Sequence, residues 1–194
     1  MSDLTDDSLT ESQAARRGRI LDAALDLSAE GGFDAVQMRE VAARADVALG
    51  TLYRYFPSKE NLLLSVMGVQ VEGLADRLSR RPPEGTDPVE RVVDVLGRAN
   101  RALQRQPDVT VAMIRALVSG GADLAPVVAA NRDGMRRIIS DALGPDVAAP
   151  DDRDLEIDLL NDVWLAALIA WIAGTQPAES VMPKLESAAR ALLG

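Results

Sequence analysis

Five residues close together in the sequence carry side chains suited to contact with a nucleic acid: Gly50, Thr51, Tyr53, Tyr55 and Lys59. Because Gly50 and Thr51 are small, a helix that carries them can approach base edges closely, where the Thr51 methyl and hydroxyl can each contact a base. Tyr53 and Tyr55 offer phenolic donors to phosphates, and Lys59 adds a positive charge at the start of a helix. The stretch predicts a DNA-reading helix flanked by phosphate contacts.

Further candidates precede this stretch. Gln37 and Arg39, at the start of an expected helix, are placed for a phosphate. The arginines that could reach the DNA backbone or the minor groove are Arg16, Arg17 and Arg19. The predicted DNA-contacting residues are Gln37, Arg39, Leu49, Gly50, Thr51, Tyr53, Tyr55 and Lys59.

Helices must position these residues, and the apolar pattern indicates helices almost throughout. Apolar residues recur at i, i+3 and i+4 and hardly ever alternate, so the fold class is all-α, with about nine helices and no strands. Gly31 and Gly32 are expected to end the first helix, with Phe33 beneath that turn, and Ser58 to cap the fourth. The expected helices are Ser12–Glu30, Met38–Ala45, Ala48–Tyr55, Ser58–Arg80, Pro88–Arg105, Asp108–Ser119, Leu124–Leu143, Asp152–Ala173 and Ser180–Leu193.

Each of the proposed DNA contacts has a simpler structural alternative. A pair of helices as short as 38–45 and 48–55 is more often plain packing than a DNA-reading unit. Tyr53 and Phe56, three residues apart, would then fill a small core, which is the role expected for Phe56 and one of two open for Tyr53. Arg44 and Arg54 are equally compatible with a solvated face or with ion pairs.

Composition excludes many other functions. The 194 residues are 47% hydrophobic and 26% charged, which is typical of one globular unit or two small ones. Without cysteine or histidine the chain lacks thiolate nucleophiles, imidazole bases and the usual zinc ligands, so we expect neither an enzyme nor a metal or other cofactor. No long apolar stretch or signal sequence is evident, which favours the cytoplasm and no membrane contact.

Taken over the whole chain, the net charge of −9 argues against a nucleic-acid binder. Residues 12–60, however, carry seven basic and seven acidic side chains, so the excess acid lies elsewhere. The acidic segment Asp151–Asp158 stands at the start of an expected helix, where carboxylates favour the helix dipole and need no catalytic role. The candidate DNA-reading region is therefore neutral.

The run VAARADVALGTLYRYFPSKENL, residues 41–62, closely resembles the DNA-binding signature of the TetR family of bacterial transcriptional repressors, with the match covering about Arg16 to Leu63. The resemblance implies a three-helix helix-turn-helix DNA-binding domain (12–57) and an all-α ligand-binding and dimerisation domain (58–194). It also implies a palindromic double-stranded operator and a homodimer. The preceding segment (1–11) is acidic and has no bulky apolar stripe, so we expect it to be a disordered tail. Three residues depart from the usual family pattern: Gln37, Asp46 and Ala48.

Two C-terminal helices are expected to form the dimer. The helix at 152–173 has one apolar stripe containing Leu155 and Leu159 and another containing Leu160 and Trp164, so one side can face the core and the other a partner. The alternative is a helix wholly buried in a monomer. The last helix, at 180–193, would complete a four-helix interface between two subunits.

A small apolar inducer is expected among the fourth to eighth helices, because that region is rich in Ala, Val and Leu. An anionic inducer would use Arg98, Arg101 or Arg115. The segments around 36–39, 46–59, 100–105 and 162–171 further resemble actinobacterial repressors of sterol catabolism, which implies a sterol-derived or acyl-CoA-like inducer. The candidate ligand-binding residues are Leu96, Leu103, Met113, Leu117, Val128, Met135, Leu160 and Trp164.

Two alternatives to that interpretation are open. A TetR-type repressor of efflux or fatty-acid genes would respond to another apolar inducer. A module that has lost DNA binding and serves only protein interaction is a different class, against which the presence of Gly50, Thr51, Tyr53 and Lys59 argues.

Overall fold

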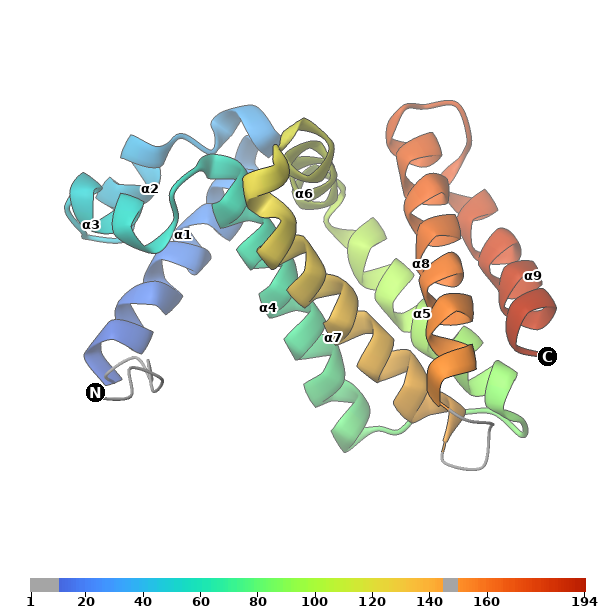
Figure 1. The fold of residues 1–194 in the computed structure, drawn as a ribbon. Coiled ribbons are helices and arrows are strands. Elements are labelled where there is room, and N and C mark those ends of the chain that lie inside the picture. Colours follow the sequence, from blue (N-terminus) through green and yellow to red (C-terminus); the bar gives the residue numbers. More distant parts are fainter. Residues whose placement is uncertain (1–10, 145–149) are drawn as a thin grey trace.

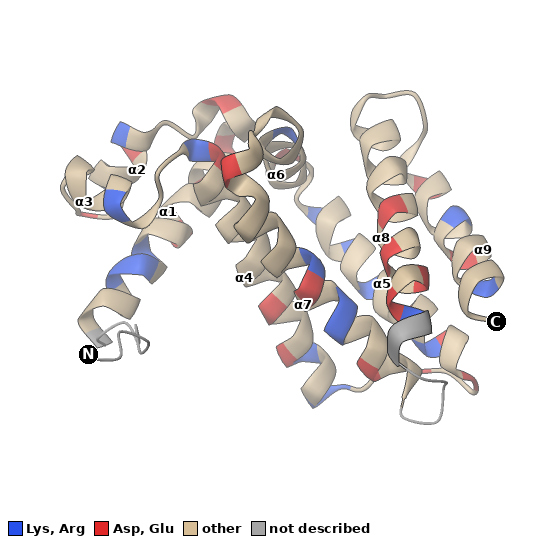
Figure 2. Cartoon of the chain, viewed as in Figure 1, with Lys and Arg blue, Asp and Glu red and all other residues tan. Residues whose placement is uncertain are grey.

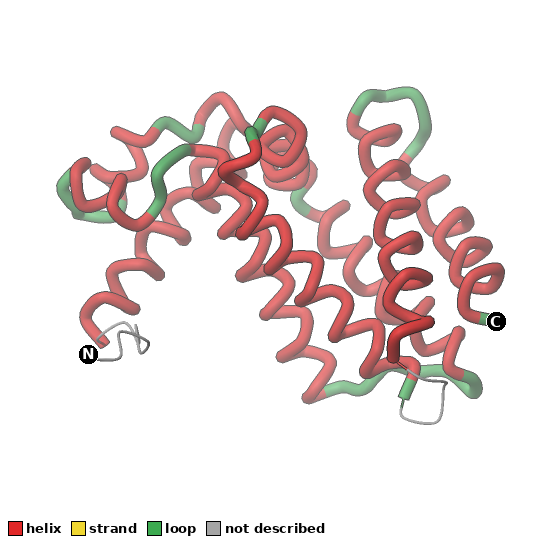
Figure 3. Tube along the Cα trace, viewed as in Figure 1, coloured by secondary structure: helices red, strands yellow, loops and turns green. Residues whose placement is uncertain are grey.

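The structure is a computed structural model that describes residues 11–144 and 150–194. Over those residues it contains nine α-helices, two short 3-10 turns and no strand, which confirms the all-α prediction (Figures 1 and 3). The predicted acidic tail lies outside the described residues, apart from Glu11, at which α1 begins. The helices are α1 (Glu11–Ala35), α2 (Met38–Arg44), α3 (Leu49–Tyr55), α4 (Lys59–Arg80), α5 (Pro88–Arg105), α6 (Pro107–Ser119), α7 (Ala125–Leu143), α8 (Pro150–Ile172) and α9 (Val181–Leu193).

The first helix is interrupted where the sequence predicts its end. Gly31 and Gly32 have non-helical backbone angles, and the φ of Gly32 is +64°, a left-handed conformation that glycine adopts at little cost. The chain then turns once more as helix, up to Ala35, instead of ending at Glu30. This kink brings Phe33, which is partly buried, against the hydrophobic core as predicted.

The turn between α2 and α3 is fixed by backbone hydrogen bonds. The amide of Val47 donates to the carbonyl of Ala42 (3.0 Å) and that of Asp46 to the carbonyl of Ala43 (3.2 Å), the pattern of a Schellman motif. Asp46 has a φ of +51°, which explains why glycine is usual at this place. Ala48 caps α3 without a side-chain hydrogen bond, so the tight turn orients this helix.

The start of α4 agrees with its predicted capping. The Ser58 side chain accepts a hydrogen bond from the amide of Asn61 at 3.1 Å, while Pro57 separates α3 from α4. From this cap α4 extends to Arg80 and therefore joins the α1–α3 end of the molecule to the remaining helices (Figure 1).

Two hydrophobic clusters form the interior. The first, here called the head-side core, combines α1–α3 and the first half of α4 with α6. The second, the effector core, combines the end of α4 with α5, α7, α8 and α9. The head-side core thus extends past the predicted domain boundary at residue 57, because Val109, Ala112, Met113 and Ala116 of α6 are buried in it.

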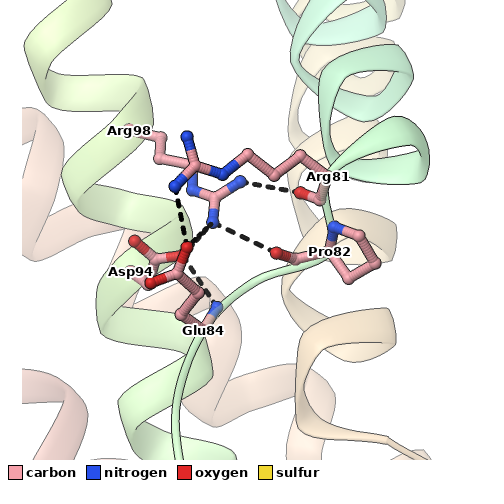
Figure 4. A network of polar contacts seen from close by, with 5 residues as sticks. All are labelled: Arg81, Pro82, Glu84, Asp94 and Arg98. Carbon is pink, nitrogen blue, oxygen red and sulfur yellow. Dashed lines mark hydrogen bonds and ion pairs between the residues drawn. The ribbon is translucent and has the colours of Figure 1, made fainter.

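The loop between α4 and α5 is held by Arg98 (Figure 4). Its guanidinium donates to the carbonyls of Arg81 (2.7 Å) and Pro82 (3.1 Å), which lie at the end of α4, and pairs with Asp94 at 2.6 Å. The Asp94 carboxylate also accepts from the amide of Glu84 at 3.0 Å. Although burial raises the pKa of Asp94, these hydrogen bonds outweigh it and hold that pKa below the ordinary value.

Among residues 11–144 and 150–194, no single helix is long and apolar enough to cross a membrane. Taken together, the helices Pro107–Ser119 and Ala122–Leu143 have the length and composition of a span, but they are bent by 118° relative to each other.

Candidate nucleic-acid interface and effector core

The outer face of α3 carries Gly50 and Tyr53, two of the residues that the sequence singled out. Gly50 is exposed, and a methyl group added there would meet no atom within 4 Å. Thr51 is half-buried, and Tyr53 is 47% exposed. Leu52 on the opposite face is fully buried, so packing of that residue turns Gly50 and Tyr53 outward. Leu49 is partly buried against the head-side core and supports the helix from within.

The remaining two aromatic residues of this segment point inward. Phe56 is 2% exposed, which agrees with its expected role in the core. The Tyr55 hydroxyl is buried and has no hydrogen-bond partner in the described part of the chain. A phosphate contact by Tyr55 therefore requires its side chain to turn outward, whereas the exposed ring of Tyr53 is already on the surface.

Basic residues occur along α1, α2 and α3 (Figure 2), and several have structural partners. Arg19 donates to the carbonyl of Ala45 at the end of α2 (3.2 Å), and Arg44 forms an exposed ion pair with Glu30. The hydrogen bond from Arg44 lowers the pKa of Glu30. These contacts orient the helix-turn-helix unit.

The two expected phosphate contacts at the start of α2 lie on the surface. Gln37 is the N-cap residue of α2, but its side chain makes no capping hydrogen bond. Both Gln37 and Arg39 are exposed. Neither side chain is engaged in capping this helix, so both remain suited to a phosphate.

Lys59, the first residue of α4, lies at the junction between α1–α3 and the rest of the molecule. Its ammonium is 3.8 Å from the centroid of the Phe33 ring, and the Arg115 guanidinium of α6 is 4.6 Å from the same centroid. Burial lowers the pKa of Lys59, opposed by the nearby carboxylates of Asp34 and Glu60. The sequence did not single out Arg115 for this junction, because nothing local links residue 115 to residues 33 and 59.

The predicted ligand-binding residues divide between the two cores. Leu103 packs against both cores and lies where they meet. The head-side core includes Met113, Leu117 and Val128. The effector core includes Leu96, Met135, Leu160 and Trp164.

Of the three arginines considered for an anionic inducer, two already have partners. Arg98 holds the loop between α4 and α5, and Arg115 pairs with Asp34. Arg101 is exposed, and its guanidinium lies beside Gly97, as does the end of the Met182 side chain of α9. A surface groove between the beginning of α5 and the end of α9 involves none of the predicted ligand-binding residues; it is lined by Asp87, Pro88, Val89, Glu90, Val93, Asp94, Glu186, Arg190, Leu193 and Gly194.

The two apolar stripes of α8 differ in exposure as the sequence predicts. Leu160 and Trp164 are buried in the effector core. Leu155 is 66% exposed and Leu159 is 43% exposed, and Ile169 extends this outer face. One side of α8 therefore packs against the effector core, while the other exposes leucine and isoleucine to solvent.

Both parts of the chain match families of known proteins. Residues 20–66 match the family model described as bacterial regulatory proteins of the tetR family, and residues 85–192 match a Tetracyclin repressor-like C-terminal domain. The chain belongs to the TetR family. It is 42% identical over 189 residues to the HTH-type transcriptional repressor KstR of Rhodococcus jostii, with 97% of this chain and 88% of that protein covered.

Solved structures of TetR-family proteins agree with this assignment. A TetR transcriptional regulator from Rhodococcus sp. RHA1 is 33% identical, with a TM-score of 0.86 over 94% of this chain and 98% of that one. The TetR-family repressor FadR of Thermus thermophilus, solved in complex with lauroyl-CoA, is 26% identical, with a TM-score of 0.74 over 91% of this chain and 93% of that one. In this TetR-family chain, α2 and α3 occupy the helix-turn-helix region.

Proposed function

We propose that the protein is a ligand-responsive transcriptional repressor that binds a palindromic DNA operator as a homodimer and is released by a small apolar inducer. The observation that carries the proposal is the outward face of α3, where Gly50 and Tyr53 are exposed at one end of the molecule. A recognition helix with a small residue on its outer face fits closely into the major groove. Phosphate contacts from Gln37, Arg39 and Lys59 would set its register.

The proposed dimer follows from α8. Reading two halves of a palindrome requires two recognition helices, spaced by about one or more turns of the duplex. The exposed leucines of α8 offer an apolar surface for a second copy of the chain, with α9 completing a four-helix contact. In this proposal, residues 12–57 form the DNA-binding domain, and residues 58–194 form the domain for ligand binding and dimerisation.

The proposed inducer is sterol-derived or acyl-CoA-like. Similarity to KstR along nearly the whole chain favours genes of sterol or lipid catabolism, and FadR of T. thermophilus was solved with an acyl-CoA. The apolar residues of the effector core suit such a ligand. A repressor of fatty-acid genes with an acyl-CoA inducer is the second candidate, supported by that FadR complex.

Repression would be relieved because the inducer binds one conformation better than the other. A coupling free energy of about 1–3 kcal/mol corresponds to roughly 5–150-fold weaker DNA binding. No covalent step is involved in this proposal, which assigns the protein a regulatory and not an enzymatic role in the cytoplasm.

The decisive experiment is a genome-wide pull-down of DNA fragments bound to the protein, followed by fluorescence anisotropy on the enriched fragment. A palindromic fragment that binds tightly, and more weakly with a sterol-acid or fatty acyl-CoA thioester, is the expected result. Affinity should fall with salt, with a slope corresponding to about 4–8 phosphates for a dimer. Binding that is independent of salt and of sequence would contradict DNA recognition, and equal binding with every thioester would contradict the switch.

A further inference from the structure

Five side-chain atoms in the C-terminal half are buried without a hydrogen-bond partner in residues 11–144 and 150–194: Asn100 Oδ1, Arg136 Nε, Glu156 Oε2, Asn161 Nδ2 and Trp164 Nε1. Of the five residues, only Asn100 on α5 and Trp164 on α8 are buried as whole residues. Asn100 is 1% exposed and Trp164 is 8% exposed. Buried polar groups are nearly always hydrogen-bonded, because one without a partner loses its hydration and gains nothing in return. Two such residues beside the apolar effector core indicate a polar partner from outside the chain.

Both groups belong to the same apolar region. Asn100 lies on the face of α5 that also carries Leu96 and Leu103, which are four residues before it and three residues after it. Leu96 is buried in the effector core together with Leu160 and Trp164, and Leu103 packs against that core as well. The Asn100 amide and the Trp164 indole therefore border the same core.

The Asn100 oxygen and the Trp164 indole N–H need opposite hydrogen-bond partners. The Asn100 oxygen accepts a hydrogen bond, whereas the Trp164 N–H donates one. A hydroxyl group does both at once, a ketone oxygen only accepts, and a hydrocarbon does neither.

We propose that Asn100 and Trp164 form a specificity-determining pair that binds a hydroxyl group on an otherwise apolar inducer. The hydroxyl would donate to Asn100 and accept from Trp164, while Leu96, Leu103 and Leu160 contact the surrounding hydrocarbon. This inference rests on the proposed function, since it needs an inducer within the effector core. It adds a chemical requirement that apolar packing alone does not impose.

Matched probes test the proposal in the absence of DNA. One series consists of cholestane, cholestan-3-one and cholestan-3-ol delivered from cyclodextrin, and a second consists of dodecane, 2-dodecanone and 2-dodecanol, so that the two arms distinguish a sterol from an aliphatic source. Protein labelled with ¹⁵N-tryptophan reports each indole N–H by NMR, and Trp171→Phe assigns the Trp164 signal. We expect the alcohol of one series to bind about tenfold more tightly than its hydrocarbon and to shift the Trp164 indole proton downfield.

Substitutions separate ligand recognition from stability. Asn100→Leu and Trp164→Phe should each remove the preference for the alcohol over the hydrocarbon. Asn100→Leu should leave the melting temperature unchanged or raised because it removes an unpaired buried amide oxygen. Asn131→Leu is the matched control: Asn131 donates to the carbonyl of Leu64 at 2.9 Å, so its loss should lower the melting temperature and leave the preference intact.

The inference is overturned if alcohols and hydrocarbons bind equally to the unsubstituted protein, if no probe binds, or if Asn100→Leu keeps the preference. Its failure is distinguishable from failure of the proposed function. If the protein prefers the alcohol but the alcohol does not release it from DNA, the hydroxyl site is supported and inducer-controlled DNA binding is contradicted. If all three members of a series release the protein from DNA equally, inducer-controlled DNA binding is supported and the hydroxyl site is contradicted.

Discussion

Arg115 of α6 forms an ion pair with Asp34 at the end of α1, with Nη1 and Oδ2 2.9 Å apart. The same guanidinium lies over the Phe33 ring, which also contacts Lys59 at the start of α4. Helices α1, α4 and α6 therefore meet around one aromatic ring, at the junction between α1–α3 and the remaining helices. A shift of α6 would therefore change the contacts that α6 makes with the end of α1, beside the start of α4.

The Asp34–Arg115 pair should contribute to stability at neutral pH and cease to do so in acid. The hydrogen bond from Arg115 lowers the pKa of Asp34 below its ordinary value of 3.8. The contribution is therefore fully present above pH 3.8 and disappears as the pH falls through the lower, folded-state pKa. Asp34→Asn should unfold with a shallower acid limb in circular dichroism below that pH. An acid limb identical to that of the unsubstituted protein would show that the pair contributes nothing.

Gly50→Ala should separate folding from DNA binding. The added methyl meets no atom of the subunit within 4 Å, and alanine favours a helix over glycine, so the free energy of unfolding should rise by about 1 kcal/mol. Operator affinity should fall by about tenfold or more, because the methyl would lie between α3 and the base edges and overpack that contact. Chemical denaturation and fluorescence anisotropy measure the two effects.

A glycine on α4 supplies the control for that substitution. A methyl added at Gly73 would meet the flexible end of Arg77 at 3.3 Å and nothing on the proposed DNA face. Gly73→Ala should keep full operator affinity. Equal loss of affinity in the Gly50 and Gly73 variants would argue against α3 as the recognition helix.

Tyr53→Phe and Tyr55→Phe form a second matched pair. Tyr53 is 47% exposed, so loss of its hydroxyl should remove a hydrogen bond to a charged phosphate, worth about 1.5 kcal/mol or roughly tenfold in affinity. The Tyr55 hydroxyl is buried without a partner in the described residues, so Tyr55→Phe should keep operator affinity and leave the melting temperature unchanged or slightly raised. The reverse order of affinities would show that Tyr55 turns outward on DNA.

Asp46→Gly should stabilise the turn between α2 and α3. Asp46 has a φ of +51°, a conformation that costs most residues about 1–2 kcal/mol and glycine very little. After allowing for the larger entropy of glycine in the unfolded chain, the free energy of unfolding should rise by about 0.5–1 kcal/mol. Ala43→Gly, within α2, should instead lower it by about 1 kcal/mol. Denaturant titration of both variants checks the sign.

The helices were predictable because their signals are local. Paired glycines at 31 and 32, Ser58 before α4 and the apolar spacing each act within a few residues, and the structure follows them within about three residues at most ends. The largest difference is at α1, which turns on past Gly32 to Ala35 because packing of Phe33 continues the helix beyond the kink.

The contacts between helices were not predictable, because they join residues far apart in the chain. Arg115 meets Asp34, Arg98 meets the carbonyls of Arg81 and Pro82, and the head-side core includes α6. Asn100 did carry a signal, since it is a polar residue between Leu96 and Leu103 on an apolar helix face. Tyr55 carried none, because a phenol can point either inward or outward on so short a helix.

Placing a charge on the outer face of α8 should prevent dimer formation and with it operator binding. Leu155 is 66% exposed and Leu159 is 43% exposed, and an arginine at either place would have to be buried without a partner in the proposed interface. We expect Leu155→Arg and Leu159→Arg to sediment as folded monomers in analytical ultracentrifugation and to lose operator affinity.

Val118→Arg controls for surface charge in general. Val118 is 63% exposed at the end of α6, away from the α8 stripe, so this variant should remain a dimer with unchanged affinity for the operator. Dimers of normal stability in both leucine variants would place the subunit contact elsewhere. Loss of the dimer in all three variants would indicate that added charge acts nonspecifically and would remove the support that these leucines give to an α8 interface.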